Sequence, residues 1–389
     1  MNDASGQTLD LLARLVAFPG VSADSNLALI DYVQAFLQAR GFEVHRIPDA
    51  TGHKAGLFAR IGPGDRPGVL LSGHTDVVPV EGQDWRHDPF RLRIEAGRAY
   101  GRGTTDMKGF LAAMLTLADR AAGAALKEPL SLAFSWDEEV GCLGIRQMID
   151  QLAPTIGLPR AVIVGEPTGM QVAIGHKGKR AFRATCTGRP GHSALAPHYL
   201  NALHLAADFM AGLRALQADL AQSGARDPAY AVPYATLHVG RLAGGAALNM
   251  VPQTARLDFE LRHLARDDVG AICARIDAAA RAVVAPHRAR FPEAHIEVTE
   301  VNAYPGLDTD PADPVVAWAQ GLSGIDAPPV KVAYGTEAGF FAALGIPTIV
   351  CGPGVMEQDG HKPDEGLDLA QLAACDAMLA RLLSDSLSA

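Results

Sequence analysis

The stretch of residues 69–79, which reads VLLSGHTDVVP, constrains the fold of this chain most strongly. Its first residues form a short apolar run of the kind used by a buried parallel strand, because both faces of such a strand are covered. His74 follows the run, where a side chain faces the crevice in which open α/β sheets bind ligands. Asp76 lies on the same side of an extended chain and could accept a proton from His74. The pattern suits a metal-bound histidine, but also a histidine satisfied within a strand-end turn.

Other segments of the first half continue this arrangement of apolar strands and helices. Apolar strands are expected at residues 130–134 and 162–164, and a helix is expected at residues 110–121. An alternation of this kind indicates an α/β sheet. The same alternation of strands and helices resumes at Tyr304 and continues to a final helix.

The pattern of apolar and polar residues changes near Gly178. Residues 179–187 alternate between apolar and polar side chains, which predicts a strand with one exposed face. The segments that follow predict the order β-α-β-β-α-β, which is that of a ferredoxin-like unit. We therefore predict an α/β domain with a mixed sheet, formed by residues 1–177 and 303–389. An α+β domain at residues 178–302 would interrupt it.

The composition argues against several classes of function. Acidic residues outnumber basic ones by 43 to 34 and no dense run of Lys and Arg occurs, so nucleic acid is not expected as a partner. The first residues lack the basic, apolar and small-residue order of a secretion signal, and no apolar stretch reaches membrane-spanning length. The five cysteines are scattered and odd in number, which indicates reduced cysteines in a cytoplasmic protein.

A set of polar residues stands just past the apolar strands, at a helix start or in a late loop: His74, Asp106, Glu138, Glu139, Glu166 and His361. Each has an ordinary explanation on its own, such as a helix cap for Asp106 or a solvated strand-end charge for Glu138. Taken together, two histidines and several carboxylates without thiolates form a nitrogen and oxygen ligand set that suits zinc. A carboxylate that bridges two ions about 3.5–4 Å apart would complete a site able to activate water.

Six segments, in order, resemble those of the dinuclear zinc deacylases and peptidases. This family includes acetylornithine deacetylases, succinyl-diaminopimelate desuccinylases, aminoacylases and glutamate carboxypeptidases. The segments are SGHTDVVP (72–79), GRGTTDMKG (101–109), DEEVG (137–141), GEPT (165–168), GRPGHSA (188–194) and GHKPDE (360–365). Further segments are most similar to those of the acetylornithine deacetylases: SWDEEVGCLG (135–144), HKG (176–178) and GTEAGFF (335–341).

The resemblance implies a zinc-peptidase-like catalytic domain with two metal positions. The implied ligands are His74, Asp106 and Glu166 for one zinc ion, and Asp106, Glu139 and His361 for the other. Asp106 would therefore bridge the two ions. The family also implies a cis peptide between Asp106 and Met107.

The resemblance assigns three residues to catalysis. Asp76 would orient His74. Glu138 would take a proton from the attacking water and deliver it to the leaving amine, which requires a pKa near the working pH. In the family, the equivalent of His192 reaches the active site of the partner subunit of a homodimer and stabilises the developing oxyanion. The surrounding residues also fit a surface histidine in a Gly-Pro turn.

The resemblance also suggests residues that bind the substrate. Asn249 and Arg262, in the inserted domain, would contact the substrate backbone and its α-carboxylate, for which the forked guanidinium is suited. Thr336 and its neighbours Gly335 and Glu337 could line the pocket for the acyl group or side chain. Glu337 would suit a cationic side chain.

These assignments predict a cytoplasmic, homodimeric amide hydrolase with two Zn²⁺ ions per subunit, or Co²⁺ in their place. The inserted domain would serve as a lid and dimerisation domain. The predicted reaction removes the acetyl group from the small molecule N2-acetyl-L-ornithine, giving L-ornithine and acetate for arginine biosynthesis. Succinyl-diaminopimelate, acetylcitrulline and other N-acyl amino acids or dipeptides are alternative substrates, because specificity depends on a few pocket contacts. A non-catalytic metal-binding scaffold is a further alternative, but it would have little need of a general base such as Glu138.

Overall fold

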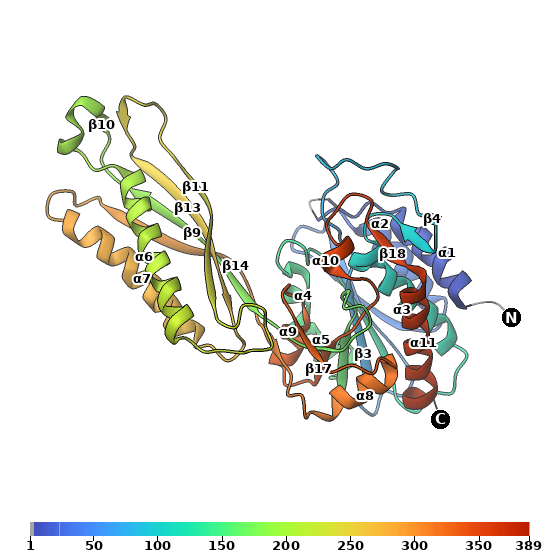
Figure 1. The fold of residues 1–389 in the computed structure, drawn as a ribbon. Helices are drawn as coiled ribbons and strands as arrows, with labels where there is room; N and C mark the ends of the chain where they lie inside the picture. Colours follow the sequence, from blue (N-terminus) through green and yellow to red (C-terminus); the bar gives the residue numbers. More distant parts are fainter. Residues whose placement is uncertain (1–3, 23, 389) are drawn as a thin grey trace. The chain divides into compact units, whose positions relative to one another are not determined.

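The computed structural model describes residues 4–22 and 24–388. The chain divides into two compact units, drawn in Figure 1. Unit 2 comprises His176–Gly306 and Ala333–Gly335, and the remainder of the chain forms unit 1. The predicted insertion, at residues 178–302, falls inside unit 2. Among the described residues, no helix combines the length and apolar character needed to cross a membrane.

A nine-stranded mixed sheet forms the centre of unit 1, which confirms the expected α/β class. In spatial order its strands are β1 (Glu43–Pro48), β2 (Ala55–Ile61), β6 (Leu130–Ser135), β3 (Val69–His74), β7 (Ala161–Val164), β17 (Thr348–Val350), β8 (Ala173–His176) and β15 (Leu307–Asp308), with β16 (Val330–Val332) paired to β8. The four strands β6, β3, β7 and β17 run parallel to one another. Their apolar residues are almost wholly buried because helices cover both faces of this part of the sheet.

The helices of unit 1 lie on both faces of the sheet (Figure 1). One group shares a single hydrophobic core with the sheet: α1 (Ala4–Val16), α2 (Leu27–Gln38), α3 (Gly109–Ala121), α8 (Pro314–Ser323) and α11 (Leu369–Arg381). The other group contacts the sheet from the opposite face: α4 (Leu143–Met148), α5 (Leu152–Ile156) and α9 (Ala338–Ala343). Helix α3 is wholly buried along most of its length, so it lies between the sheet and the outer helices α1 and α11.

The sequence did not predict a small three-stranded sheet in unit 1. Its strands, in spatial order, are β18 (Gly366–Asp368), β5 (Arg98–Tyr100) and β4 (Arg93–Glu95). These strands are short and carry little apolar patterning, and β18 pairs with a strand far away in the sequence. The sheet brings the loop after Tyr100 next to the loop before Gly366.

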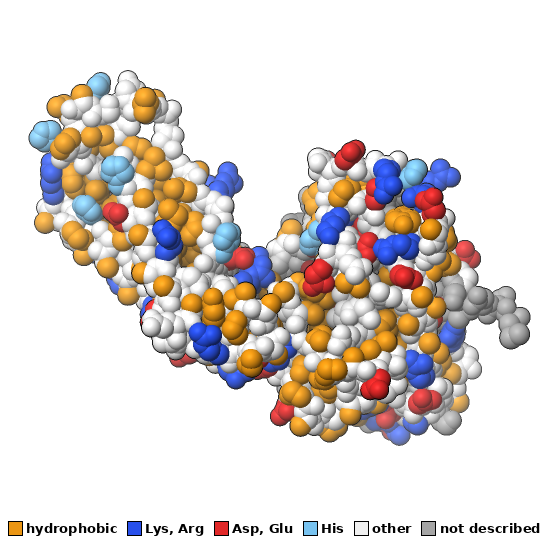
Figure 2. All heavy atoms as spheres, viewed as in Figure 1, with side chains coloured by type: hydrophobic (Ala, Val, Ile, Leu, Met, Phe, Trp, Pro, Cys, Tyr) orange, Lys and Arg blue, Asp and Glu red, His pale blue; other side chains and the backbone are white. Residues whose placement is uncertain are grey.

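Unit 2 contains the four-stranded antiparallel sheet β14-β9-β13-β11 and two helices that pack on it. In chain order the elements are β9 (Gly178–Thr187), α6 (Ala202–Ser223), β11 (Thr236–Gly244), β13 (Thr254–His263), α7 (Val269–Val284) and β14 (His295–Tyr304). The chain order β-α-β-β-α-β is that of a ferredoxin-like unit, as expected. In its core Phe182 stacks on Phe259, and Phe209 meets Phe259 edge-on. Figure 2 shows several histidines and many hydrophobic side chains on the surface of this unit.

Candidate metal centre

Most of the polar residues singled out above lie at the carboxyl ends of the parallel strands. Strands β6, β3 and β7 are parallel, so their carboxyl ends meet at the same edge. His74 is the last residue of β3, Glu138 and Glu139 follow β6, and Glu166 follows β7. Asp106 lies between β5 and α3 in a single irregular helical turn, η1 (Thr104–Lys108). The Asp106–Met107 peptide is cis, as expected.

The Asp106 carboxylate lies at the centre of the site, between two histidines. His74 Nε2 is 3.0 Å from Asp106 Oδ1, and His361 Nε2 is 3.1 Å from Asp106 Oδ2. His361 Nε2 is also 3.0 Å from a carboxylate oxygen of Glu139, and His74 Nε2 is 3.8 Å from Glu166 Oε1. The structure therefore brings all five predicted ligands into one cluster, with the expected bridging residue in the middle.

The hydrogen bonds of His74 determine which ring nitrogen faces the metal position. Its Nδ1 lies 2.9 Å from the backbone carbonyl oxygen of Asp76, which can only accept. Nδ1 must therefore be the donor, and Nε2 is the nitrogen that faces Asp106 and Glu166. Burial disfavours a charged ring, but the hydrogen bonds to Asp106 and Asp76 raise the pKa of His74 well above its usual range, so a cation bound here would replace the Nε2 proton. The Asp76 carboxylate was expected to accept this proton, and one of its oxygens lies 3.5 Å from Nδ1, where, against the effect of burial, the interaction with His74 lowers the pKa of Asp76. The backbone carbonyl and the carboxylate of Asp76 therefore both face Nδ1, and the carbonyl is the nearer of the two.

The Asp76 carboxylate has another role, which the sequence did not reveal. Its two oxygens accept from the backbone amides of Glu138 and Glu139, at 3.1 and 3.3 Å. It also accepts from the Ser22 hydroxyl at 2.7 Å. Asp76 thus connects the end of β3 to the turn after β6. It positions His74 and the Glu138–Glu139 pair relative to each other.

The electrostatics of the cluster favour bound cations. Burial, together with the neighbouring carboxylates, raises the pKa of Glu138 to about 8 and that of Glu139 to about 7. Burial and Asp106 also raise the pKa of Glu166 well above its ordinary range. Within the described part of the chain, the buried Glu166 Oε1 has no hydrogen-bond partner. Crowded carboxylates and an unpartnered buried oxygen beside histidine nitrogens fit cation ligands, because cations relieve the repulsion and satisfy the oxygen.

Glu138 lies inside this cluster. One of its carboxylate oxygens is within 4.8 Å of ligand atoms of both His74 and Glu166. Its carboxylate accepts from the Cys142 thiol at 3.3 Å. This position is compatible with a proton carrier beside the metal ions, and its proximity to His74 and Glu166 also makes it a potential ligand.

The expected pocket residues Thr336 and Glu337 are fully buried. The Thr336 hydroxyl accepts from the Ala338 amide at the start of α9, so the described contact is a structural one. Glu337 accepts from the hydroxyls of Ser72 and Ser135, at 2.5 and 2.7 Å. The expectation that Glu337 faces a cationic substrate is therefore wrong in this structure. The carboxylate joins strands β3 and β6. Thr336 as a substrate contact stays a prediction.

The three remaining predicted residues lie in unit 2. His192 and Asn249 are both exposed, and the short strands β10 (Gly191–His192) and β12 (Met250–Val251) bring them together. The Asn249 carbonyl accepts from the Ser193 amide at 3.0 Å. Arg262 lies near the end of β13, where its guanidinium donates to the Glu260 carboxylate at 3.0 and 3.3 Å and to the Tyr304 hydroxyl at 2.7 Å. The roles of these three residues at an active site stay predictions.

The fold and the cluster together define a metal-dependent hydrolase with an α/β catalytic unit. Residues 70–385 match peptidase family M20/M25/M40, and the chain belongs to this family. Acetylornithine deacetylase from Proteus mirabilis (strain HI4320) is 33% identical over 386 residues, which cover 97% of this chain and 96% of the relative. The corresponding enzyme from Klebsiella pneumoniae (strain 342) is 34% identical over 370 residues, or 92% of each chain.

A solved structure shares the fold along the whole chain. An M20 family metallo-carboxypeptidase from Sulfolobus solfataricus superposes with a TM-score of 0.78 at 19% identity and covers 97% of this chain and 98% of its own. The family and the relatives show that this chain is a hydrolytic enzyme of the metal-dependent amidohydrolase class.

Proposed function

We propose that this enzyme removes the acetyl group from N2-acetyl-L-ornithine to give L-ornithine and acetate, a step of arginine biosynthesis. The convergence of two histidines and several carboxylates on Asp106, with Glu138 beside them, supports the amide hydrolysis. The choice of substrate is supported by the acetylornithine deacetylases, which match almost the full length of the chain.

We propose that two Zn²⁺ ions, or two Co²⁺ ions, bind this centre. One ion would be held by His74 and Glu166, the other by Glu139 and His361, with Asp106 shared between them. His74 would bind its ion through Nε2, because Nδ1 donates to the Asp76 carbonyl. Bound ions would polarise the acetyl carbonyl and lower the pKa of a water molecule.

Proton transfer is assigned to Glu138. Its carboxylate would take a proton from the attacking water as the carbon–oxygen bond forms. It would then give the proton to the amine nitrogen of ornithine as the carbon–nitrogen bond breaks. Burial raises the pKa of Glu138 in the metal-free site, and bound cations would lower it toward neutral pH, where the carboxyl can both accept and release a proton. Asp76 would hold the backbone of Glu138 in place throughout.

We propose that the active site is completed by a second copy of the chain. His192 and Asn249 lie beyond the start of β13, whereas Arg262 lies near its end. At about 3.3 Å per residue, the strand separates them by on the order of 25 Å, which is much longer than an N-acyl amino acid. If His192 and Arg262 both contact one substrate, they must come from different chains. The exposure of His192 agrees with this arrangement.

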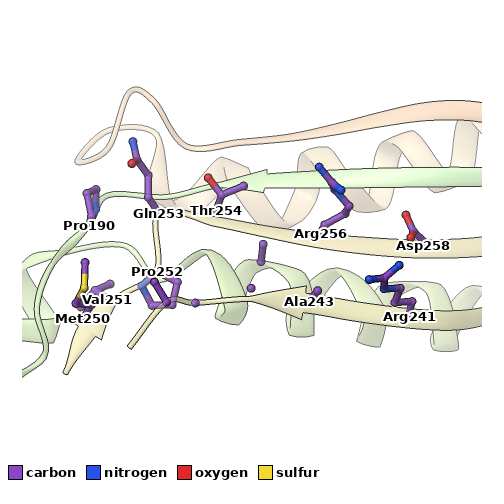
Figure 3. Close-up of a pocket in the computed structure, with 14 residues that line it drawn as sticks. Pro190, Arg241, Ala243, Met250, Val251, Pro252, Gln253, Thr254, Arg256 and Asp258 are labelled. Carbon is purple, nitrogen blue, oxygen red and sulfur yellow. The ribbon is translucent and has the colours of Figure 1, made fainter. Parts of the chain in front are cut away.

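The surface of unit 2 provides an edge for such a partner. Strand β11 stands at one edge of its sheet, and Leu242, Leu248 and Met250 are 42, 102 and 51% exposed. A groove of about 480 Å³ runs along β11 and β13, with Met250 toward one end and Arg241 toward the other (Figure 3). An edge strand with apolar residues beside it can pair with another chain.

We also propose a cytoplasmic location. The support comes from the cysteines, because the described residues contain five free thiols and no disulfide. Four of these thiols are buried. Reduced, buried thiols are typical of a reducing compartment.

The test is a comparison of kcat/KM across a panel of substrates with purified, metal-loaded enzyme. The panel contains N2-acetyl-L-ornithine, acetylcitrulline, succinyl-diaminopimelate, simple N-acetyl amino acids and a dipeptide. We expect acetylornithine to exceed every other compound by about tenfold or more, which is the range that a few pocket contacts can supply. A higher kcat/KM for the succinylated compound or the dipeptide would replace the proposed substrate while leaving the hydrolase class intact.

A further inference from the structure

A buried carboxylate outside the cluster, Glu365, is bound to the backbone that carries Asp106. Its Oε1 accepts from the amides of Thr105 and Asp106, at 2.8 and 3.0 Å, and its Oε2 accepts from the Gly103 amide at 3.0 Å. The Glu365 side chain is 1% exposed. Three backbone amides of one turn therefore converge on a single carboxylate directly behind Asp106.

Arg102 completes the environment of this carboxylate. Its guanidinium donates to Glu365 Oε2 at 2.8 Å and is itself 1% exposed. The same guanidinium donates to Gln83, whose side-chain amide donates to the His361 carbonyl at 3.0 Å. It also lies 4.9 Å from the centre of the Trp85 ring. A buried ion pair with so many additional partners joins three separate segments of the chain.

Two of these segments carry ligands of the proposed second metal ion, Asp106 in one and His361 in the other. Asp106 belongs to the turn held by Glu365 Oε1, and His361 lies only a few residues before Glu365 in the same loop. The His361 side chain is 50% exposed, so packing holds it only in part. Its distance to Asp106 therefore depends on the contacts that fix its loop.

We propose that Glu365, paired with Arg102, is a positioning residue that sets the spacing between Asp106 and His361. It thereby determines the affinity for the ion held by Asp106, Glu139 and His361. This inference rests on the proposed metal centre and adds a residue to it. The ion at His74 and Glu166 shares Asp106, but its two other ligands are held by β3, β7 and Asp76, so it depends less on this pair.

Glu365→Gln tests the proposal with little change in shape. A glutamine amide nitrogen in place of either oxygen would put a donor opposite backbone N–H groups or opposite Arg102. The measurement is a titration of the metal-free full-length protein with Zn²⁺, followed by calorimetry, which resolves the two binding steps. We expect the dissociation constant of one step to rise by about 10- to 100-fold while the other changes by less than about threefold. His361→Ala identifies the affected step, because it should remove that same step.

Two further variants separate positioning from general destabilisation. Asp376→Asn alters another buried carboxylate of unit 1, which accepts from Thr8, and should leave both binding steps unchanged. Arg102→Lys keeps the positive charge but loses the forked contacts, so it should weaken the same step as Glu365→Gln. Thermal unfolding of the metal-free proteins checks that each variant is folded.

The outcomes are distinct. Wild-type affinities in both Glu365→Gln and Arg102→Lys would overturn the proposal, and so would an equal weakening of the two steps. If the wild-type protein bound no Zn²⁺ at all, the proposed metal centre itself would fail. Selective weakening of the His361 step in both variants, with Asp376→Asn unaffected, would support the positioning role.

Discussion

Replacing Glu138 by Gln should abolish activity and at the same time stabilise the metal-free protein. Glutamine has nearly the same shape as glutamate but carries no charge and exchanges no proton. Loss of a general base that acts in both steps should lower kcat by about 10²- to 10⁴-fold, with a much smaller change in KM. The metal content should stay at about two ions per chain, because Glu138 is assigned to proton transfer and not to binding.

The gain in stability follows from the raised pKa of Glu138. Burial raises this pKa from 4.5 to about 8. That rise corresponds to a penalty on the order of 5 kcal/mol for the ionised carboxylate in the folded protein. Below pH 4.5 the carboxyl is protonated in both the folded and the unfolded chain, so the substitution has no effect through this charge. Above pH 8 the folded wild-type protein bears the whole penalty, so the free energy of unfolding of the variant should exceed that of the wild type by up to this amount.

The assay is denaturant unfolding of the metal-free proteins at pH 5, 7 and 9, beside kcat and metal content of the metal-loaded forms. The stability difference between Glu138→Gln and the wild type should grow with pH across this series. His361→Ala serves as the comparison, since it should lose activity together with metal. A Glu138→Gln protein with about one ion per chain would identify Glu138 as a ligand and would refute the assignment as general base.

Three further predictions concern the metal ligands and unit 2. His361→Ala should bind about one ion per chain instead of two, as measured by atomic absorption after dialysis; two retained ions would remove His361 from the site. His192→Ala should lower kcat without releasing metal. Mixing this variant with an equal amount of Glu138→Gln chains, followed by subunit exchange, should restore about one quarter of wild-type activity, because about half of the dimers would be mixed and each would hold one intact site out of two. No recovery in mixed dimers confirmed by mass spectrometry would argue against a shared site. Arg262→Lys should raise KM by about tenfold with little change in kcat, because Lys cannot reproduce a bidentate contact with the substrate carboxylate; an unchanged KM would contradict that contact.

Much of the fold and the metal cluster could be predicted from local sequence patterns. The apolar run before His74 predicted a buried strand, and β3 covers Val69–His74. The alternation after Gly178 and the helices that follow predicted the ferredoxin-like order of unit 2. These patterns are readable because a strand or helix repeats its environment every two or every three to four residues. Residues placed just past parallel strands converge because the carboxyl ends of those strands share one edge.

The partners of individual side chains could be learned only from the tertiary structure. Asp76 was expected to contact the His74 ring, but the sequence did not indicate that its carboxylate also accepts from the amides of Glu138 and Glu139. Glu337 was expected to face substrate, yet it is enclosed between two serine hydroxyls. Neither result has a local signal, because each contact joins segments that are distant in the sequence.

Glu365 is the clearest example of a residue that a motif identifies but whose partners only the tertiary structure shows. Its position in the GHKPDE segment marked it as part of a motif, but the motif does not tell which backbone it binds. The contact with Asp106 exists because β18 pairs with β5 and brings residues about 260 positions apart into hydrogen-bonding distance. Sequence periodicity determined which residues are buried in strands and helices and which ones stand at their ends. Long-range strand pairing decided which of those ends meet, since such pairing depends on the whole folded chain and not on any one segment.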